Sequence, residues 1–514
     1  RYASRGLGDV YKRQLLYNVI FGNLVTITLF NSFLGKAPNW YKWCIIGFLI
    51  LNPILFFALP AMGVNAGFIL GWIVLLQFIF TLIFSIQCYP LQPGGLIALQ
   101  VLFLGLTTSY HVFYEIKSNL EVILLLVFMV SAIFFMKDIL LVIFTKIIQW
   151  FRSKIILSLL FVLSAAVMSA FLDALTVTAV LISVTLGFYK IFESNLQENR
   201  ITKEEFNQGK DFLVDVIMHS VVGTALGGVC TIVGEPQNLL IATKADWDFV
   251  EFFIRMAPVT MPVLFFGLLS CILLERFKLF GYGTLLPETL KNKIIQQAED
   301  NAAKRTEMQN AHLMLEGLFG ILLVVALATH QIHHAPVGII GLFLMVLLTS
   351  FKGLVEEHKL GHAFNESLPF TALLVIFFVI VAVINDQQLF TPVITVVLAS
   401  SEDLQLPLFY AANGILSAIS DNVFVATVYM NEIVQALEND VISREQFDRL
   451  AVAINTGTNL PSVATPNGQA AFLFLLTSSL APMIGLSYLR MVYRALPYTI
   501  VLSIVGVICV ILYI

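Results

Sequence analysis

The sequence predicts an all-α polytopic membrane protein with about 11 transmembrane helices plus two re-entrant hairpins, arranged as an inverted repeat. The 514 residues are 58% hydrophobic and only 12% charged, whereas soluble domains carry about 25% charged residues. Apolar runs of about 20 residues, the length that crosses a bilayer as a helix, recur along the chain. These runs are continuous rather than alternating, which excludes a β-barrel.

The first residues are set apart from the fold. The chain starts without Met, and residues 9–14 read Asp-Val-Tyr-Lys-Arg-Gln, the translation of a transposon adapter used in sequencing libraries. We therefore expect residues 1–25 to be a non-native or disordered segment. A basic cytoplasmic tail is the alternative interpretation.

Two apolar segments differ from simple crossings. The segments at 155–188 and 404–431 are long and carry small and polar residues, including an aspartate, near the middle. We interpret both as re-entrant hairpins, because irregular backbone is tolerated in a bilayer where protein or a wet cavity surrounds it. The predicted crossings are near 42–62, 65–86, 94–108, 119–148, 213–243, 252–274, 311–330, 336–351, 367–390, 449–480 and 491–514.

The placement of Lys and Arg supports this topology. Connections rich in these residues lie at 137–154, 190–210, 276–305, 352–359 and 490–494, whereas those near 62–65, 331–335 and 391–403 carry none. With two hairpins and the crossings above, every rich connection falls on one side, which the positive-inside rule makes cytoplasmic. The N-terminus is then cytoplasmic and the C-terminus periplasmic. Treating either hairpin as a full crossing breaks the alternation.

The two halves then have opposite orientations, because hairpin one enters from the cytoplasm and hairpin two from outside. Sparse identities support a repeat. At an offset of 248, Ser169, Ala170 and Asp173 fall on Ser417, Ala418 and Asp421; at an offset of 230, Gly227, Val233 and Pro236 fall on Gly457, Val463 and Pro466. We predict a first membrane repeat over 26–275, a cytoplasmic linker over 276–310 and a second, inverted repeat over 311–514.

Three carboxylates in apolar segments are the main candidates for function: Asp173, Glu235 and Asp421. A carboxylate at the centre of a membrane helix costs about 2.5–3.5 kcal/mol on insertion scales, and such residues mark ion or proton pathways. A carboxylate out of water can hold a proton or a hard cation, and the competition between the two is itself an exchange mechanism. We therefore place a Na⁺ site at these three residues as a hypothesis.

Neutral oxygens near the carboxylates would complete the coordination of a hard cation. The second half has Thr465 at the position that matches Glu235 at the offset of 230, so we expect the more acidic first half to dominate proton coupling. For a lone Asn or Thr, a hydrogen bond between helices is the competing interpretation. The candidates are Ser169, Thr176, Thr231 and Asn238 in the first half, and Ser417, Asn422, Asn455, Thr456, Asn459 and Thr465 in the second.

Five motifs resemble the bacterial NhaB sodium/proton antiporters, and the resemblance extends from about residue 28 to the C-terminus. They are residues 31–42, Leu172-Asp-Ala-Leu-Thr, Gly234-Glu-Pro-Gln-Asn, Ser367-Leu-Pro-Phe-Thr-Ala and the long stretch Asn455–Gln469. The resemblance implies an electrogenic exchanger of Na⁺ and Li⁺ for H⁺ in the inner membrane of a Gram-negative bacterium. It further implies a homodimer, an elevator-type movement, no organic cofactor, and an important role for the aspartate at position 173.

Other classes are disfavoured. Neither Asp173 nor Asp421 lies in the Gly-x-Gly-Asp motif of intramembrane aspartyl proteases, and the chain contains no HExxH motif. We expect a transporter rather than an enzyme, with no nucleic-acid partner. A sodium-coupled carboxylate symporter is the closer rival, and an anchored scaffold would leave the paired broken segments unexplained. His219 and His111 are candidates for pH sensing, although a structural role is the competing interpretation for each.

Overall fold

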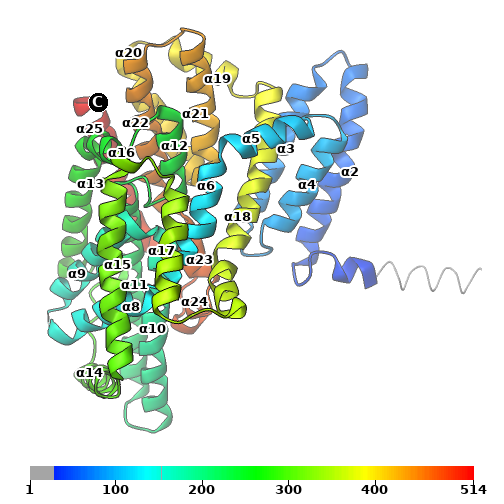
Figure 1. Cartoon of the computed structure of the whole chain (residues 1–514). Helices are drawn as coiled ribbons and strands as arrows, with labels where there is room; N and C mark the ends of the chain where they lie inside the picture. Colours follow the sequence, from blue (N-terminus) through cyan, green and yellow to red (C-terminus); the bar gives the residue numbers. More distant parts are fainter. Residues whose placement is uncertain (1–27, 152) are drawn as a thin grey trace, which may run out of the picture. The chain divides into compact units, whose positions relative to one another are not determined.

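The computed structural model describes residues 28–151 and 153–514, and the predicted non-native segment 1–25 lies outside them. Every regular element in the described residues is a helix, which confirms the all-α polytopic class. Nine of the described helices are long and apolar enough to cross a membrane, or ten if the bent pair Ser109–Ser118 and Leu120–Phe134 is one span. The chain forms two compact units, Arg1–Gly105 and Leu106–Ile514 (Figure 1).

The first unit includes the helices α2 (Asn39–Ala61), α3 (Ala66–Ile83) and α4 (Leu91–Phe103), which are joined by short connections. A cluster of amides links all three. Asn52 donates to Gln77 Oε1 and to Gln100 Oε1 at 2.8 Å each. Hydrogen bonds between polar side chains contribute to helix association where the surroundings are apolar.

The second unit begins with α5 (Ser109–Ser118), α6 (Leu120–Leu124), the π-helical turn η1 (Leu125–Met129) and α7 (Val130–Phe134). The chain bends by 65° between α5 and α6. The prediction of one crossing over 119–148 is wrong, because α7 ends at Phe134 and a separate helix, α8 (Lys137–Trp150), follows. The charged residues Lys137 and Asp138 start α8, which buries Leu140 and Phe144.

Further helices of this unit are α14 (Glu288–Ala303), α15 (Glu307–Ala328), α16 (His330–His333), α17 (Val337–Phe351), α18 (Glu357–Asp386) and α19 (Thr391–Leu398). Lys352, which follows α17, pairs with Glu316 of α15 at 2.6 Å and donates to the Phe135 carbonyl at 2.9 Å. The predicted linker 276–310 contains α14, whose Leu290 and Ile294 are buried. The predicted boundaries of the repeats stay a prediction.

Helix α9 (Lys154–Leu172) runs in the same direction as α11 (Lys203–Gly228). At one end, Lys154 lies 3.6 Å from Asp215. At the other end, the Thr231 hydroxyl donates to the carbonyl of Ala170. Contacts at both ends in the same order require parallel axes.

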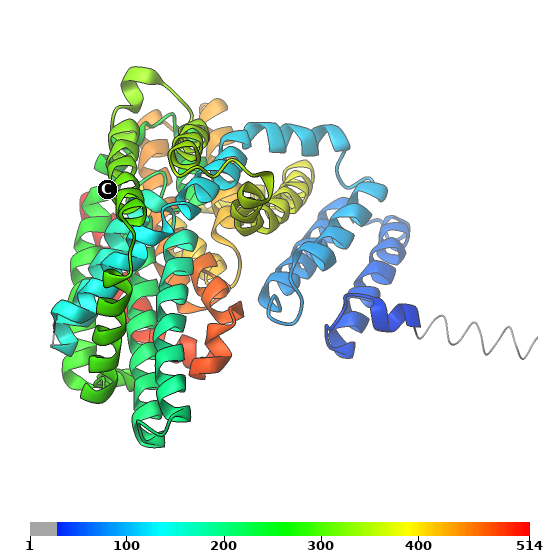
Figure 2. The same ribbon diagram turned by 60° about the horizontal axis from the view of Figure 1, so that its bottom comes forward.

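Helix α10 (Ala174–Gln197) runs against α11 and therefore against α9. Ala174 N donates to the Gly234 carbonyl at 3.2 Å, whereas Phe192, near the other end of α10, packs at Gly209 early in α11. Helices α9 and α10 thus form a hairpin that opens toward residues 198–202, the end we call the α10–α11 side. Both views show α10 and α11 running side by side to this end (Figure 2).

The second hairpin repeats this plan in the opposite orientation. Helix α20 (Glu402–Ser417) runs parallel to α22 (Arg444–Asn459), because Gln446 donates to Gln405 near the start of both and Ser417 donates to the Thr458 carbonyl near their ends. Helix α21 (Asn422–Glu438) runs against both, because Asn422 at its start donates to Ser462 just beyond the end of α22. The Arg444 guanidinium donates to the Ala245 carbonyl at the end of α12 (Pro236–Ala245), which continues α11. Hairpin two therefore opens at the end opposite to hairpin one, the α21–α22 side, as predicted for an inverted repeat.

Three long segments complete the core around the hairpins. They are α13 (Phe249–Phe277), the broken continuation of α22 through η3 (Pro461–Ala464), α23 (Ala470–Thr477) and α24 (Leu480–Ile484), and the last helix α25 (Tyr488–Tyr513). Arg449 donates to the carbonyl of Ile514, which places the C-terminus on the α21–α22 side.

Candidate ion-binding site

Asp173 forms the tip of hairpin one. It is fully buried and has a positive φ of 64°, a conformation uncommon for a residue with a side chain. Its Oδ2 accepts from the backbone N–H groups of Leu175 and Thr176 at 3.1 and 3.3 Å. The carboxylate therefore caps α10 at the positive end of the helix dipole.

The first helix break lies directly against this tip. Helix α11 ends at Gly228, and α12 begins at Pro236, which cannot donate a backbone hydrogen bond. Asn238 closes the break by donating to the carbonyls of Gly228 and Thr231 at 2.7 Å each. Glu235, only 3% exposed, immediately precedes α12.

Two glycines allow α9 and α11 to touch backbone to backbone. A Cβ at Gly223 would lie 2.5 Å from the Val162 carbonyl oxygen, and one at Gly227 would lie 1.8 Å from that of Ala166. Only glycine fits at such a distance. Because hairpin one rests directly on α11, the positions of Asp173 and the break depend on each other.

The second copy has the same internal contacts. Asp421 caps α21 by accepting from Val423 N and Phe424 N at 2.9 and 3.3 Å. The Thr465 hydroxyl donates to the Ala418 carbonyl at 2.6 Å and accepts from Gly468 N at 3.3 Å. In the first copy, Thr231 makes the corresponding contacts with Ala170 and Gly234.

These contacts correct the predicted register between the two breaks. Thr231 and Gly234 match Thr465 and Gly468 at an offset of 234, not 230, so the structural counterpart of Glu235 is Gln469 and not Thr465. The two copies still differ in charge, as predicted, because Glu235 of the first copy corresponds to the neutral Gln469 of the second.

The two breaks meet through an amide network. Gln237 donates to Asn459 Oδ1 at 2.7 Å. The Asn459 amide donates to Asn238 Oδ1 at 3.2 Å and to the Asn455 carbonyl at 2.8 Å. The network therefore joins the start of α12 to the end of α22.

Several oxygens of the first copy are buried and have no hydrogen-bond partner among the described residues. They are Ser169 Oγ, Asp173 Oδ1, Thr176 Oγ1 and Glu235 Oε1. In the second copy only Gln469 Oε1 shares this property. Buried polar atoms are normally satisfied, so the first copy presents a set of acceptors suited to a hard cation.

Several other predicted residues of the second copy form hydrogen bonds within the protein. Ser417 contacts the Asn422 amide and donates to the Thr458 carbonyl at 2.7 Å. Asn455 donates to the Met256 sulfur, and the Thr456 hydroxyl bonds back to the Val452 carbonyl within its own helix. This hydroxyl therefore supports the helix and is not presented to the break.

Sequence reasoning missed two residues of the site, Gln237 and Gln469. Both are buried, and both follow a break directly. Their position after Glu235-Pro236 and after Asn467-Gly468 was the available signal. Among the residues that the structure describes, no three His, Cys, Asp or Glu side chains are grouped to hold a metal ion. A Na⁺ site can be built from one or two carboxylates, neutral side-chain oxygens and the backbone carbonyls at a helix break, so it does not require a cluster of three such side chains.

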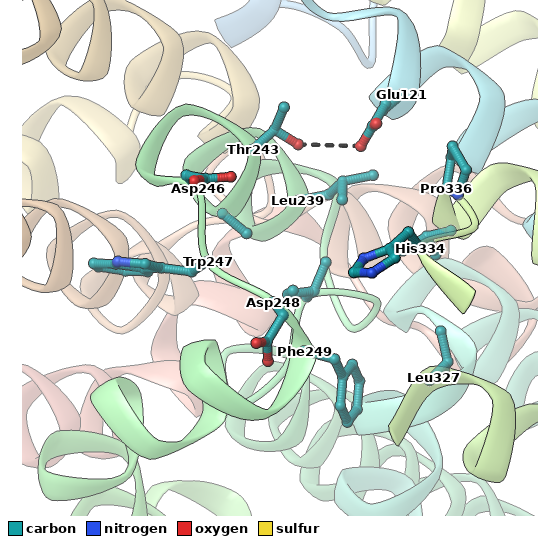
Figure 3. A pocket seen from close by; sticks show the side chains of 13 residues that line it. Glu121, Leu239, Thr243, Asp246, Trp247, Asp248, Phe249, Leu327, His334 and Pro336 are labelled. Carbon is teal, nitrogen blue, oxygen red and sulfur yellow. Dashed lines mark hydrogen bonds between the residues drawn. The ribbon is translucent and has the colours of Figure 1, made fainter. Parts of the chain in front are cut away.

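A cavity of about 190 Å³ lies on the α21–α22 side of the first break (Figure 3). Ile232 of the break and Leu239 of α12 belong to its wall. Its polar lining includes Glu121, whose Oε2 accepts from the Thr243 hydroxyl at 3.3 Å. The cavity brings polar surface from that side close to the first break.

Two opposed hairpins, each lying against a broken helix with buried carboxylates at the junction, define a secondary transporter with an inverted repeat. A family model described as "Bacterial Na+/H+ antiporter B (NhaB)" matches residues 24–514, and the chain belongs to this family. It is therefore a multi-pass membrane protein of a bacterial antiporter family.

The chain is similar to proteins named Na(+)/H(+) antiporter NhaB, and the similarity covers nearly the whole length of each. The relative from Teredinibacter turnerae is 56% identical over 496 residues, which cover 93% of this chain and 97% of the relative. The relative from Yersinia enterocolitica is 56% identical over 491 residues, 92% of this chain and 91% of the relative. That from Klebsiella pneumoniae strain 342 is 55% identical over 498 residues, 94% of each chain.

Proposed function

We propose that the protein exchanges Na⁺, and also Li⁺, for H⁺ across the bacterial inner membrane by alternating access. The observation that carries this proposal is the set of buried, unpartnered oxygens around Asp173 and Glu235. The printed names of the relatives support the identity of the two ions. The ions themselves drive the exchange, so the proposal requires no organic cofactor.

The charge balance of the site explains how one ion would replace the other. Asp173, Glu235 and Asp421 form no ion pair with a Lys or Arg in the described part of the chain. Two buried carboxylates, Asp173 and Glu235, beside the half-buried Asp421 are unstable as unpaired negative charges, so protons or cations would neutralise them. Na⁺ arriving at Asp173 and Glu235 would displace a proton, and a proton arriving later would displace Na⁺.

The two copies would share this work unequally. The carboxylate of Glu235 can bind and release a proton, whereas the amide of Gln469 at the matching position cannot. We therefore assign proton–sodium competition to the first copy. The second copy, with Asp421, Asn422 and Ser417, would act as a more neutral cation-binding partner. Asn238 and Asn459 would pass a change in one break to the other.

The orientation follows the distribution of cations. The α10–α11 side carries Lys190, Arg200, Lys203 and Lys210 on or beside its connection, which supports a cytoplasmic location for this side. The C-terminus, on the α21–α22 side, is then periplasmic, and we assign the N-terminus to the cytoplasm. A homodimer rests on the family resemblance alone.

Everted membrane vesicles provide the test. After respiration acidifies the vesicle lumen, Na⁺ or Li⁺ should collapse the pH gradient, and Asp173→Asn should abolish this response at a normal level of membrane insertion. Vesicles from cells lacking other sodium/proton antiporters supply the background. If Na⁺ moved no protons while succinate uptake required Na⁺, the protein would be a carboxylate symporter and the proposal would be wrong.

A further inference from the structure

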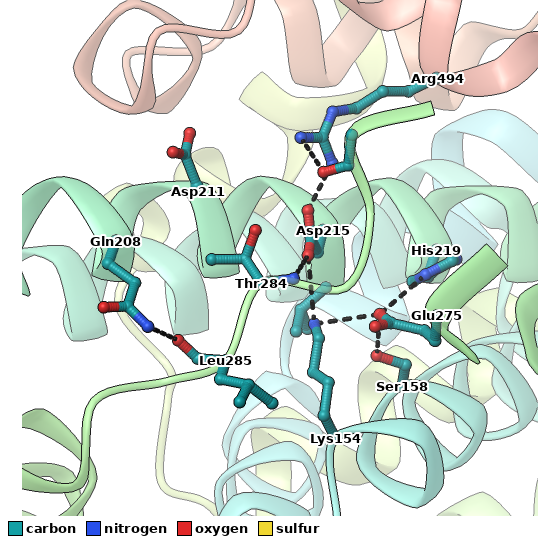
Figure 4. A network of polar contacts seen from close by, with 12 residues as sticks. Lys154, Ser158, Gln208, Asp211, Asp215, His219, Glu275, Thr284, Leu285 and Arg494 are labelled. Carbon is teal, nitrogen blue, oxygen red and sulfur yellow. Dashed lines mark hydrogen bonds and ion pairs between the residues drawn. The ribbon is translucent and has the colours of Figure 1, made fainter. Parts of the chain in front are cut away.

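A buried network of charged residues, toward the α10–α11 side, joins helices around the ion-binding site to one another (Figure 4). Lys154 of α9 lies 3.1 Å from Glu275 of α13 and 3.6 Å from Asp215 of α11. Arg494 of α25 pairs with the other oxygen of Asp215. All four residues are at most 9% exposed. The network therefore holds together the core, by which we mean the two hairpins, the two broken helices, α13 and α25.

A second polar network, on the α21–α22 side, joins this core to helices outside it. Lys244, near the end of α12, donates to Asn431 Oδ1 of α21 at 2.7 Å. Glu115 of α5 interacts with both of these side chains. Its Oε1 also accepts from the Asn385 amide of α18 at 2.7 Å. The four residues thus connect α12 and α21 of the core with α5 and α18, which lie outside it.

The charges make this connection costly to separate. Glu115 is only 9% exposed and Asn431 only 8%, so the carboxylate has little access to water. A buried charge that loses its partner is strongly destabilising. If α12 moved away from α5, Glu115 would lose the positive charge of Lys244. The network therefore stabilises the arrangement in which α12 lies against α5.

The cavity on the same side shows where a route to the ion-binding site would run. Ile232 and Leu239 line it from the core, and Glu121 of α6 lines it from outside. The Thr243 hydroxyl donates to Glu121 across this boundary at 3.3 Å (Figure 3). Widening the cavity into an open route requires α12 to part from α6. Because α5 leads directly into α6, the contact between Lys244 and Glu115 would part as well.

Helix α12 links this boundary directly to the ion-binding site. Its ten residues begin immediately after Glu235, and Lys244 is the ninth of them. At 1.5 Å per residue, these two side chains start about 14 Å apart along the helix axis. Asn238 of the same helix closes the first break. A displacement of Lys244 would therefore be transmitted to the break.

The corresponding helix of the second copy ends without this charge. At the offset of 234, Lys244 falls on Ser478, which follows α23. The Ser478 hydroxyl donates to the Leu475 carbonyl at 2.7 Å, within its own segment. The lysine at the end of α12 thus has no charged counterpart at the end of α23, so the network favours closure of one side over closure of the other.

We propose that Lys244 and Glu115 are positioning residues that hold closed the route from the α21–α22 side to the first break. This inference rests on the proposed function and on its assignment of the α21–α22 side to the periplasm. In each cycle the pair separates when this side opens and forms again when it closes. Loss of the pair makes the closed state rarer, which weakens the apparent binding of Na⁺ that arrives from the cytoplasm.

The test compares the two faces of the membrane. Everted and right-side-out vesicles would be given an acid-inside pH gradient by dilution from ammonium, and Na⁺ in the medium would collapse it. In Lys244→Met the apparent KM for Na⁺ should rise at least about fivefold in everted vesicles and should fall in right-side-out vesicles. Fewer folded molecules would lower the maximal rate at both faces but would not move the two KM values in opposite directions.

A matched control is Lys352→Met, which removes the cation of a buried pair with Glu316 that lies outside the core. It should not move the two KM values in opposite directions. The double variant Glu115→Gln with Lys244→Met removes both charges, leaves neither unpaired, and keeps the inference testable if the single variant does not insert. It should show the same opposite shifts as Lys244→Met.

KM values that stayed unchanged, or changed equally at the two faces, in Lys244→Met or in the double variant would overturn the inference and leave the proposed function intact. Opposite shifts in Lys352→Met would also overturn it, because they would not depend on contacts between the core and α5. A wild-type protein that moved no protons with Na⁺ would instead overturn the proposed function.

Discussion

Substitution of Gly227 directly tests the backbone contact between α11 and α9 of hairpin one. In Gly227→Ala the new Cβ would lie 1.8 Å from the Ala166 oxygen, whereas ordinary contacts begin at 3.4 Å. Helix α9 would have to move by the difference, 3.4 − 1.8 = 1.6 Å. Forcing extra atoms into a packed core costs about 1–3 kcal/mol, and a misplacement of about 1 Å at a reactive site can reduce the rate about 10²-fold.

The matched control is Gly187→Ala in α10 of the same hairpin, where nothing lies within 4 Å of the added carbon. Alanine in a helix interior is favoured over glycine by about 0.5–1 kcal/mol, so this variant should be at least as stable as wild type. Both variants would be compared by thermal unfolding in detergent and by Na⁺-driven collapse of the pH gradient. If Gly227→Ala unfolded and exchanged like wild type, the inferred backbone contact would be wrong.

Three further predictions follow from the charges. Glu235→Gln makes the first break resemble the second at Gln469, so the exchange rate should fall about 10²-fold; a variant that kept a tenth of the rate would contradict the assignment. Asp215→Asn leaves buried cations underpaired and should lower the free energy of unfolding by about 3–5 kcal/mol. Asp211→Asn, which breaks a partly exposed pair with Arg490, should cost under about 1 kcal/mol, and equal losses in the two variants would refute the argument. Because H⁺ competes with Na⁺, the apparent KM for Na⁺ should rise as pH falls, by up to about tenfold per unit for one competing proton; a constant KM would exclude competition.

The architecture of the core was predictable because it depends on local signals. Asp173 and Asp421 interrupt apolar segments, and each ends one helix and caps the next. The bias of Lys and Arg predicted that the two hairpins open in opposite directions, as they do in the structure. The bend at Asn119 and the separate helix α8 were missed, because apolar composition alone does not reveal where a long segment turns.

The details of the site depend on contacts between distant residues, which composition cannot reveal. The register of the second break required the contacts of Thr465 with Ala418 and Gly468, so identity at a fixed offset misplaced it. Gln469 belongs to the site only because the chain folds it against Asn459. His219 was recognised as a candidate from its sequence position, but its partner Tyr498 is 279 residues away.

The central claim is that Na⁺ and H⁺ occupy the same carboxylates, and proton release on Na⁺ binding tests it most directly. Purified protein in weakly buffered detergent solution would be titrated with NaCl while the pH is recorded, with choline chloride as the control for ionic strength. The account predicts a saturable release of protons by Na⁺ and Li⁺ that is lost in Asp173→Asn and reduced in Glu235→Gln. Saturable Na⁺ binding with no proton release, or undiminished release in both variants, would contradict it.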